Sequence, residues 1–231
     1  MALILCLETS SKNCSVAISK DGETIFSRDR FDEDYCHGEQ LHPLINDLLF
    51  DSKYSMEDFD AFALSAGPGS YTGLRIGAAS VKGLSFALDK AVISISTLKS
   101  MLLGFKESDP IKGNEYDLFC PILDSRKDEV YLAIYDSEYN EIVSPCACNI
   151  YSFDFKNHLQ TNKMCLFGPG SYKFEPILKH NDIVFLNKNY PSARFLGSLA
   201  EFKYKNKDFV DTAYFEPMYL KPFMPTLKKK I

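Results

Sequence analysis

The sequence predicts an α/β fold of two lobes, each with the element order βββαβαβα and a mixed sheet flanked by helices. Short apolar runs alternate with stretches of helical periodicity along the chain. The pentapeptide GPGSY occurs at residues 67–71 and again at residues 168–172, each time after the fourth predicted strand of a half. An acidic residue, Glu8 or Asp124, ends the first strand of each half, and an isoleucine follows at the same interval. These repeats indicate a duplicated unit.

The first lobe is expected over residues 1–105. It opens with an antiparallel meander, because Asp21 and Gly22 form a hairpin turn signal between two strand-like runs. Apolar residues at helical spacing then predict a helix over residues 34–50, and Ser96 is placed to cap the last helix of this lobe. The predicted strands are residues 2–7, 14–19, 23–30, 59–64 and 91–95.

The second lobe is expected over residues 106–231, and its first ten residues carry the turn formers of a linker. A proline-punctuated tail, residues 211–231, can return to the first lobe, and its three final lysines are typical of a solvated chain end. The predicted strands are residues 116–123, 129–135, 141–143, 164–167 and 183–186, and the predicted helices are residues 152–159, 170–179 and 191–202.

Composition excludes several classes of protein. The 231 residues carry a net charge of −5 with a pI near 5.4, so the chain is not a nucleic-acid binder held by a basic surface. The seven cysteines are scattered, and the pair Cys146 and Cys148 has no second pair of matching spacing, so no metal is expected. The first residues predict a strand, so no signal segment is expected, and no apolar run is long enough to span a bilayer. These features favour a cytoplasmic protein with free thiols.

The stretch from 66 to 88 predicts a helix with an unusual face. Ser70 is placed as its N-cap, and Gly69, Gly73 and Gly77 fall at every fourth position. Each interior glycine costs a helix about 1 kcal/mol relative to alanine, so a compensating contact is required. Residues four apart share one face, which leaves a bare groove where another backbone can approach. The groove fits either the helix's own sheet or a second subunit, and we favour the second subunit.

Two such lobes with an acid at the first hairpin resemble the ribonuclease H-like architecture of actin, sugar kinases and Hsp70-type ATPases. That resemblance implies hairpins that grip ATP phosphates and acids that hold magnesium, which requires glycines whose backbone N–H groups point at phosphate. Residues 9–13 and 125–128 contain no glycine, so a working cradle is not expected. A nucleotide-binding ATPase or kinase-like enzyme remains the alternative function, and its candidate ligands are Glu8, Thr9, Ser10, Asp124, Gly168 and Gly170.

No catalytic residue and no metal ligand is assigned from the sequence. His37 and His42 are five residues apart, so their side chains diverge around a helix instead of sharing the i, i+4 face of a metal pair. The residues around Ser70 do not form the Gly-x-Ser-x-Gly elbow of a hydrolase, nor does a phosphate-loop lysine follow the turn.

Residues 67–77, GPGSYTGLRIG, resemble the signature of the TsaB (YeaZ) family. Weaker matches lie at residues 7–10, 37–45, 124–131 and 217–220, so the resemblance spans nearly the whole chain. The chain departs from the family pattern at three positions: Glu8 replaces the usual aspartate, His42 a common leucine and Lys221 a frequent arginine. The first departure weakens any metal role at this position.

The resemblance implies a non-catalytic dimerisation or scaffold subunit. In the bacterial complex that transfers threonylcarbamoyl to the tRNA adenosine next to the anticodon, TsaB pairs with TsaD and recruits the ATPase TsaE. ATP and metal would then be bound by the partner subunits, and no cofactor is expected for this chain alone. The chain would contact tRNA only as part of the complex. A homodimer is expected when the partner is absent. No contact with a membrane is expected. The implied interface comprises His37, Leu41, Leu44, Ile45, Leu48, Gly69, Gly73, Leu74, Gly77, Ser80 and Val81.

Overall fold

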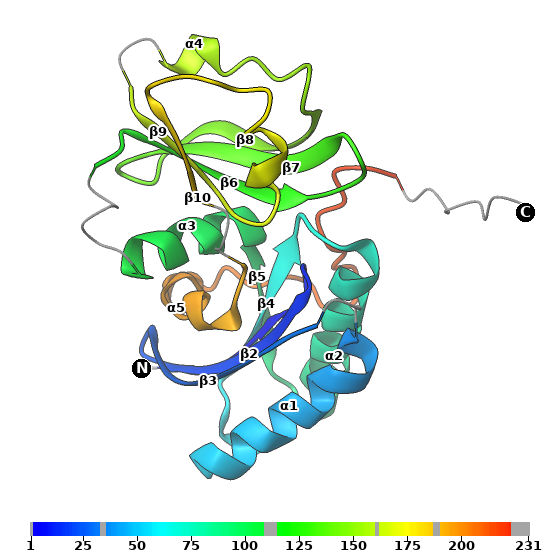
Figure 1. The fold of residues 1–231 in the computed structure, drawn as a ribbon. Coiled ribbons are helices and arrows are strands. Elements are labelled where there is room, and N and C mark those ends of the chain that lie inside the picture. The colour runs from blue at the N-terminus through cyan, green and yellow to red at the C-terminus, as the bar shows by residue number, and fades with distance from the viewer. Residues whose placement is uncertain (1, 33–35, 109–114, 160–161, 187–189, 223–231) are drawn as a thin grey trace, which may run out of the picture.

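The computed structural model describes residues 2–32, 36–108, 115–159, 162–186 and 190–222. The chain forms two mixed five-stranded sheets, one above the other in Figure 1, with helices between them and on the outer face of the lower sheet. The predicted α/β fold of two lobes is confirmed.

The two sheets repeat one topology. The first has the strand order β3-β2-β1-β4-β5 and the second the order β8-β7-β6-β9-β10, so each begins with an antiparallel meander and continues with two parallel strands. The strands are β1 (Leu3–Glu8), β2 (Asn13–Lys20), β3 (Glu23–Phe31), β4 (Ala61–Gly67), β5 (Ala91–Ser96), β6 (Leu118–Asp124), β7 (Glu129–Asp136), β8 (Glu141–Asn149), β9 (Met164–Phe167) and β10 (Ile183–Leu186).

The helices of the first half are longer than those of the second. Ser70 caps α2 as predicted, because its hydroxyl accepts a hydrogen bond from the backbone N–H of Gly73 at 3.3 Å. Short 3₁₀ turns lie at Met56–Asp58, Ser171–Lys173 and Ala193–Phe195. The α-helices are α1 (His37–Ser52), α2 (Tyr71–Leu88), α3 (Thr97–Ser108), α4 (Lys156–Leu159) and α5 (Gly197–Lys205).

The second lobe departs from the predicted helices. The helix expected over 152–159 is the single turn α4, and the one expected over 170–179 is reduced to the 3₁₀ turn Ser171–Lys173. Phe155 and Phe174 pack edge to face, with ring centroids 5.1 Å apart, so two aromatic side chains cover this face of the sheet where helices were expected. The third strand is longer than predicted because β8 is an edge strand, where Pro145 is tolerated.

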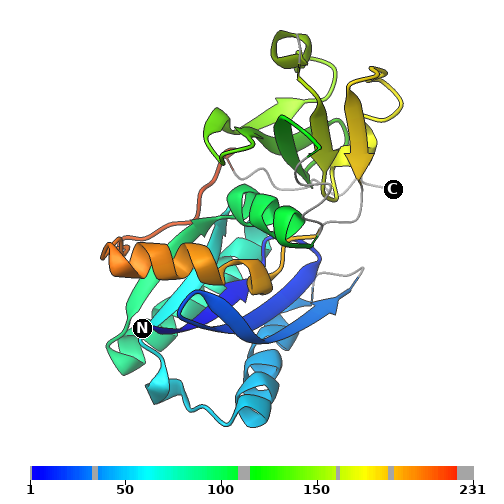
Figure 2. The same cartoon turned by 90° about the vertical axis from the view of Figure 1, so that its left-hand side faces the viewer.

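Two helices lie between the sheets and each packs on the sheet of the other half. Helix α3 packs on the second sheet, where Phe105 stacks on Phe167 with ring centroids 4.7 Å apart. Helix α5 and the turn before it pack on the first sheet, where Leu196 and Ala200 contact the small side chains of β1, β4 and β5. Figures 1 and 2 show both helices in the layer between the sheets. The linker proper, residues 109–114, lies outside the described residues.

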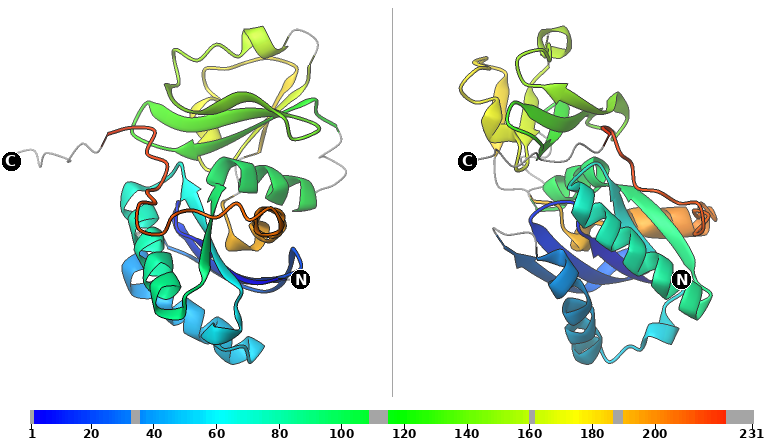
Figure 3. Two further views of the ribbon diagram at one scale, coloured as in Figure 1. Left: turned by 180° about the vertical axis from the view of Figure 1, so that it is seen from behind. Right: turned by 90° about the vertical axis from the view of Figure 1, so that its right-hand side faces the viewer.

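The C-terminal segment runs from the first lobe to the second (Figure 3). Val210 bridges to Val92 of β5, and the Met218 N–H donates to the Ala66 carbonyl of β4 at 2.7 Å. Lys221 then forms an ion pair with Glu129 at the start of β7. The three final lysines lie outside the described residues. No helix in the described part of the chain is long and apolar enough to cross a membrane.

Candidate functional site

The glycine face of α2 clamps the turn between β1 and β2. A Cβ atom on Gly73 would lie 2.0 Å from the Thr9 carbonyl oxygen, and one on Gly77 would lie 2.4 Å from the Thr9 hydroxyl. A Cβ on Gly69 would lie 2.5 Å from Ser10. The missing side chains therefore let the helix touch its own hairpin. The interpretation of these three glycines as a groove open to a second subunit is wrong, because the chain fills the groove itself.

Hydrogen bonds hold the same turn from three sides. The Ser70 N–H donates to the Ser10 carbonyl at 2.7 Å, and the Ser10 N–H donates to the Glu8 carboxylate at 2.6 Å. His37 Nε2 lies 2.6 Å from the Ser11 carbonyl. Burial lowers the pKa of His37, against the raising effect of this bond, so the neutral ring donates its Nε2 proton. His37, expected at an interface, is only 2% exposed and anchors α1 to the hairpin.

Glu8 is fully buried at the end of β1. Burial raises the pKa of its carboxyl, and the hydrogen bond from the Ser10 N–H acts against this rise. One carboxylate oxygen receives the Ser10 N–H, and the other is buried with no hydrogen-bond partner within the described part of the chain. An ionised carboxylate in this buried position costs free energy. The turn donates its Ser10 N–H to Glu8 and not to a ligand, so Glu8 stabilises the turn.

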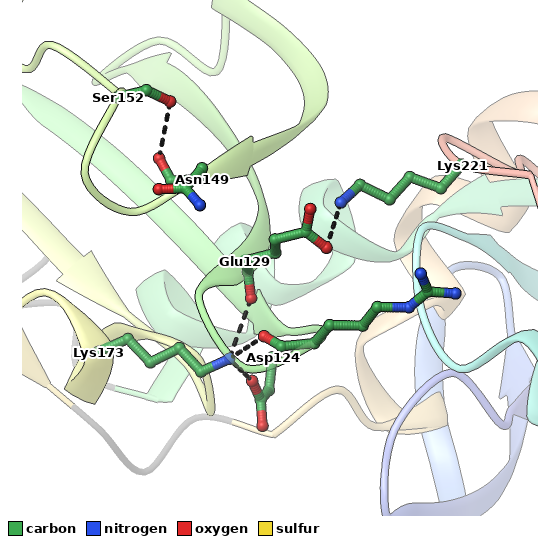
Figure 4. A network of polar contacts seen from close by, with 7 residues as sticks. Asp124, Glu129, Asn149, Ser152, Lys173 and Lys221 are labelled. Atoms are coloured by element: carbon green, nitrogen blue, oxygen red, sulfur yellow. Dashed lines mark hydrogen bonds and ion pairs between the residues drawn. The ribbon is translucent and has the colours of Figure 1, made fainter. Parts of the chain in front are cut away.

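The second turn, residues 125–128 between β6 and β7, is held by a lysine (Figure 4). Lys173 forms an ion pair with Asp124 and donates hydrogen bonds to the backbone carbonyls of Arg126 and Glu129. The acid that would hold magnesium in an ATPase is thus paired with an ammonium group of the same chain.

The repeated GPG motif has the same mechanical role in both lobes. Gly69 meets Ser10 just after β1, and a Cβ on Gly170 would lie 2.7 Å from the Leu123 carbonyl carbon at the end of β6. Gly168 has a φ of +102°, a conformation that side chains disfavour. Gly168 and Gly170, candidate nucleotide ligands from the sequence, therefore allow the chain to approach β6 closely.

The second turn, the start of α2 and the C-terminal segment line a pocket of about 290 Å³ between the lobes. Tyr71 and Tyr219 pack together at its edge, with ring centroids 4.9 Å apart, and Arg126 and Lys221 line it. A magnesium nucleotide does not fit the residues present. The first turn directs its backbone groups to Glu8, His37 and α2, and the second holds the Lys173 ammonium. Among the residues described, no group of three acidic, histidine or cysteine side chains is placed to hold a metal.

Helices α1 and α2 contact each other in the first half of α1 and the middle of α2. A Cβ on Gly38 would lie 3.9 Å from Ile76, and the Ser80 hydroxyl lies 3.2 Å from His42 Nε2. Residue numbers increase together in the two contacts, so the helices run parallel. Further along this pair a Cβ on Gly83 would meet nothing within 4 Å. Phe50 at the end of α1 is 85% exposed and Phe86 on α2 is 91% exposed. We call the exposed and half-buried positions Ser80, Gly83, Phe86, His42 and Phe50 on these two helices the α1–α2 face.

Most of the interface residues expected from the resemblance lie beneath this face. Ser80 is half-buried and belongs to it. The others form the core that attaches α1 and α2 to the sheet, so they do not present side chains to a partner; they are Leu41, Leu44, Ile45, Leu48, Leu74 and Val81. The sequence did not single out Phe50, Gly83 and Phe86, which are exposed on these helices. The sequence pattern that could have indicated them is an aromatic residue or a glycine on the side of a predicted helix opposite its apolar stripe.

The duplicated sheets and the strand-end acids define a two-lobed protein of the actin and Hsp70 class whose phosphate-binding turns are closed by its own side chains. The family model described as TsaD, tRNA N6-adenosine threonylcarbamoyltransferase, matches residues 34–210, and the chain belongs to this family. The resemblance to its TsaB (YeaZ) branch is confirmed by the relatives below.

The chain is 28% identical to the tRNA threonylcarbamoyladenosine biosynthesis protein TsaB of Haemophilus influenzae, across 94% of this chain and 93% of that protein. It is 32% identical to the Escherichia coli TsaB over 60% of this chain and 57% of that protein. Among solved structures, YeaZ from Pseudomonas aeruginosa matches with a TM-score of 0.79 and 26% identity, covering 95% of this chain and all of that one.

Proposed function

We propose that this chain is a non-catalytic subunit in the biosynthesis of threonylcarbamoyladenosine in tRNA, and that it acts by docking. Its similarity to TsaB proteins over nearly the full length supports the pathway. The observation that carries the non-catalytic role is the closure of both turns: α2 and His37 fill the first, and Lys173 fills the second. The chemistry then belongs to a partner.

The partner we propose is a TsaD-type protein, which shares this family's fold. Two exposed phenylalanines, one near the end of each helix, are costly in water, and the bare position at Gly83 lets a partner backbone come close. A face with aromatic side chains beside small ones is typical of an interface core. A partner with the same two helices can oppose them as a four-helix bundle, burying on the order of 1,600 Å² in total.

The rest of the assembly follows from this docking. A TsaE-type ATPase joins the pair, ATP and metal are used by the partner subunits, and tRNA is reached only through the complex in the cytoplasm. When the TsaD-type partner is absent, the same apolar face pairs two copies of this chain. Self-pairing and partner binding then compete, because both cover Phe50 and Phe86.

The test is co-elution of the purified chain with the TsaD-type protein of its own organism. Gly83→Arg places a long charged side chain on the α1–α2 face without an internal clash. It is expected to abolish co-elution and to leave a monomer when the chain is run alone. The matched control is Gly38→Arg, near Ile76 at the other end of the same helix pair, which is expected to weaken binding less.

A second control separates the face from a general effect of exposed aromatics. Phe202 on α5 is 67% exposed, and α5 lies on the opposite side of the first sheet (Figure 3). Phe202→Glu is expected to co-elute normally. Normal co-elution of Gly83→Arg would contradict the proposed docking face.

A further inference from the structure

A second pocket lies beside the carboxyl ends of β4 and β5, on the face of the first sheet opposite α1 and α2. Its volume is about 320 Å³, and its lining is mostly apolar. Helix α5 contributes Leu199 and Phe202, the end of β5 contributes Ile95, and the C-terminal segment contributes Met218. A concave, mostly apolar pocket of this size with a few polar groups is typical of a small-molecule site.

The polar groups of this pocket carry positive charge. Lys99 and Lys203 line it, and none of the other described residues in its lining is acidic. Lys203 forms an ion pair with Asp208 at 2.8 Å. Lys99 is half-buried on α3, and its ammonium group has no hydrogen bond or ion pair with any residue that the structure describes. A partly buried ammonium without an anion costs free energy, so the pocket has an unbalanced positive charge.

The start of α3 adds to this charge. The Ser96 hydroxyl accepts a hydrogen bond from the Lys99 N–H at 3.4 Å, and both residues line the pocket. The positive end of the α3 dipole therefore borders the pocket beside the unpaired ammonium. We propose that this pocket binds a small carboxylate that carries an aliphatic chain. The carboxylate pairs with Lys99, and the chain packs against Leu199 and Phe202.

The shape of the pocket favours a free molecule over a segment of another protein. Peptides are commonly recognised along an open sheet edge or a long groove, whereas this pocket is bounded by α3, α5 and the C-terminal segment. A molecule bound here contacts all three, so its binding stabilises the layer between the sheets. The inference does not depend on the proposed docking function, because the α1–α2 face lies on the other side of the first sheet.

The test is calorimetric titration of the full wild-type chain with sodium octanoate. We expect saturable binding at one site and a rise in the melting temperature, because the ligand binds the folded state. Octan-1-ol has the same chain without the carboxylate, and it should bind at least about tenfold more weakly.

Lys99→Met tests the proposed ion pair, since it keeps the apolar stem and removes the charge. It is expected to weaken octanoate binding by about tenfold and to leave octan-1-ol binding unchanged. The matched control is Lys20→Met, because Lys20 is an exposed lysine on β2 outside the pocket. Lys20→Met should bind octanoate as the wild type does.

Ser94→Leu tests the location, because Ser94 lines the pocket and a larger side chain would fill it. Octanoate binding should be lost; if this variant does not fold, Leu199→Phe narrows the same pocket from α5. Phe86→Ala should bind octanoate normally, which excludes adsorption on the α1–α2 face.

Three results would overturn the proposal. They are the absence of saturable octanoate binding to the wild type, octanoate affinity unchanged by Lys99→Met, and octanoate affinity unchanged by the pocket-filling variant. Tighter binding of a capped leucyl-glutamate peptide than of octanoate would also overturn it, because the pocket would then belong to an acidic segment of a partner.

Discussion

The Thr9 carbonyl oxygen lies 2.0 Å from the position that a Cβ atom on Gly73 would occupy. Helix α2 and the first hairpin are therefore in backbone contact, and the hairpin turn cannot open toward a phosphate without moving the helix. The contact joins the start of α2 to the turn that follows β1.

This contact predicts a large difference between two glycines of one helix. Gly73→Ala is expected to destabilise the protein by about 2–3 kcal/mol, because the backbone of Thr9 must shift. Gly83→Ala is expected to be neutral or to stabilise by up to about 1 kcal/mol, because the added methyl meets nothing and alanine favours a helix. Urea unfolding of both variants measures the difference, and equal effects would show that the contact is absent.

The buried Glu8 carboxyl predicts a pH dependence. Its pKa is raised by burial, so the folded state favours the protonated form, and the stability this provides is lost as pH rises through the folded pKa. Glu8→Gln keeps an acceptor for the Ser10 N–H but does not ionise. The free energy of unfolding of Glu8→Gln, relative to that of wild type, should therefore increase as the pH rises from about 5 to 8. If the difference in the free energy of unfolding between the two proteins stays constant across this range, Glu8 is not a buried ionisable group.

Lys106 predicts a stabilising contact between α3 and the second sheet. Its ammonium lies 3.9 Å from the ring centroid of Tyr139 and 4.6 Å from that of Phe119, and it donates to the Ser137 carbonyl at 2.5 Å. Lys106→Met keeps the apolar stem and removes the charge, which is expected to cost about 1 kcal/mol. Lys106→Arg should lose less in the same denaturant titration. A methionine variant as stable as wild type would show that the rings gain nothing from the cation.

Local sequence signals predicted the sheets better than the helices of the second lobe. Apolar runs and the Asp21-Gly22 turn set the meander, and the repeat of GPGSY revealed the duplicated topology. The weakly patterned stretches near Phe155 and Phe174 became aromatic packing instead, because short helices gain little without an apolar face.

The candidate site was only partly predictable. The spacing of Gly69, Gly73 and Gly77 indicated that some backbone comes close, but spacing does not say whose backbone it is. Thr9 lies 64 residues before Gly73, and Lys173 lies 44 residues after Glu129, whose backbone carbonyl it contacts. Only the folded chain brings them together, so the closure of both turns is a tertiary property.

Docking through the α1–α2 face is the action that we propose for this chain. It is tested most directly by calorimetric titration of the TsaD-type partner with wild type, Phe86→Ala and Phe202→Ala. Truncating a central interface aromatic costs about 2 kcal/mol or more, so Phe86→Ala should weaken binding by well over about tenfold, with Phe202→Ala unchanged. Equal affinities for all three proteins would contradict the account.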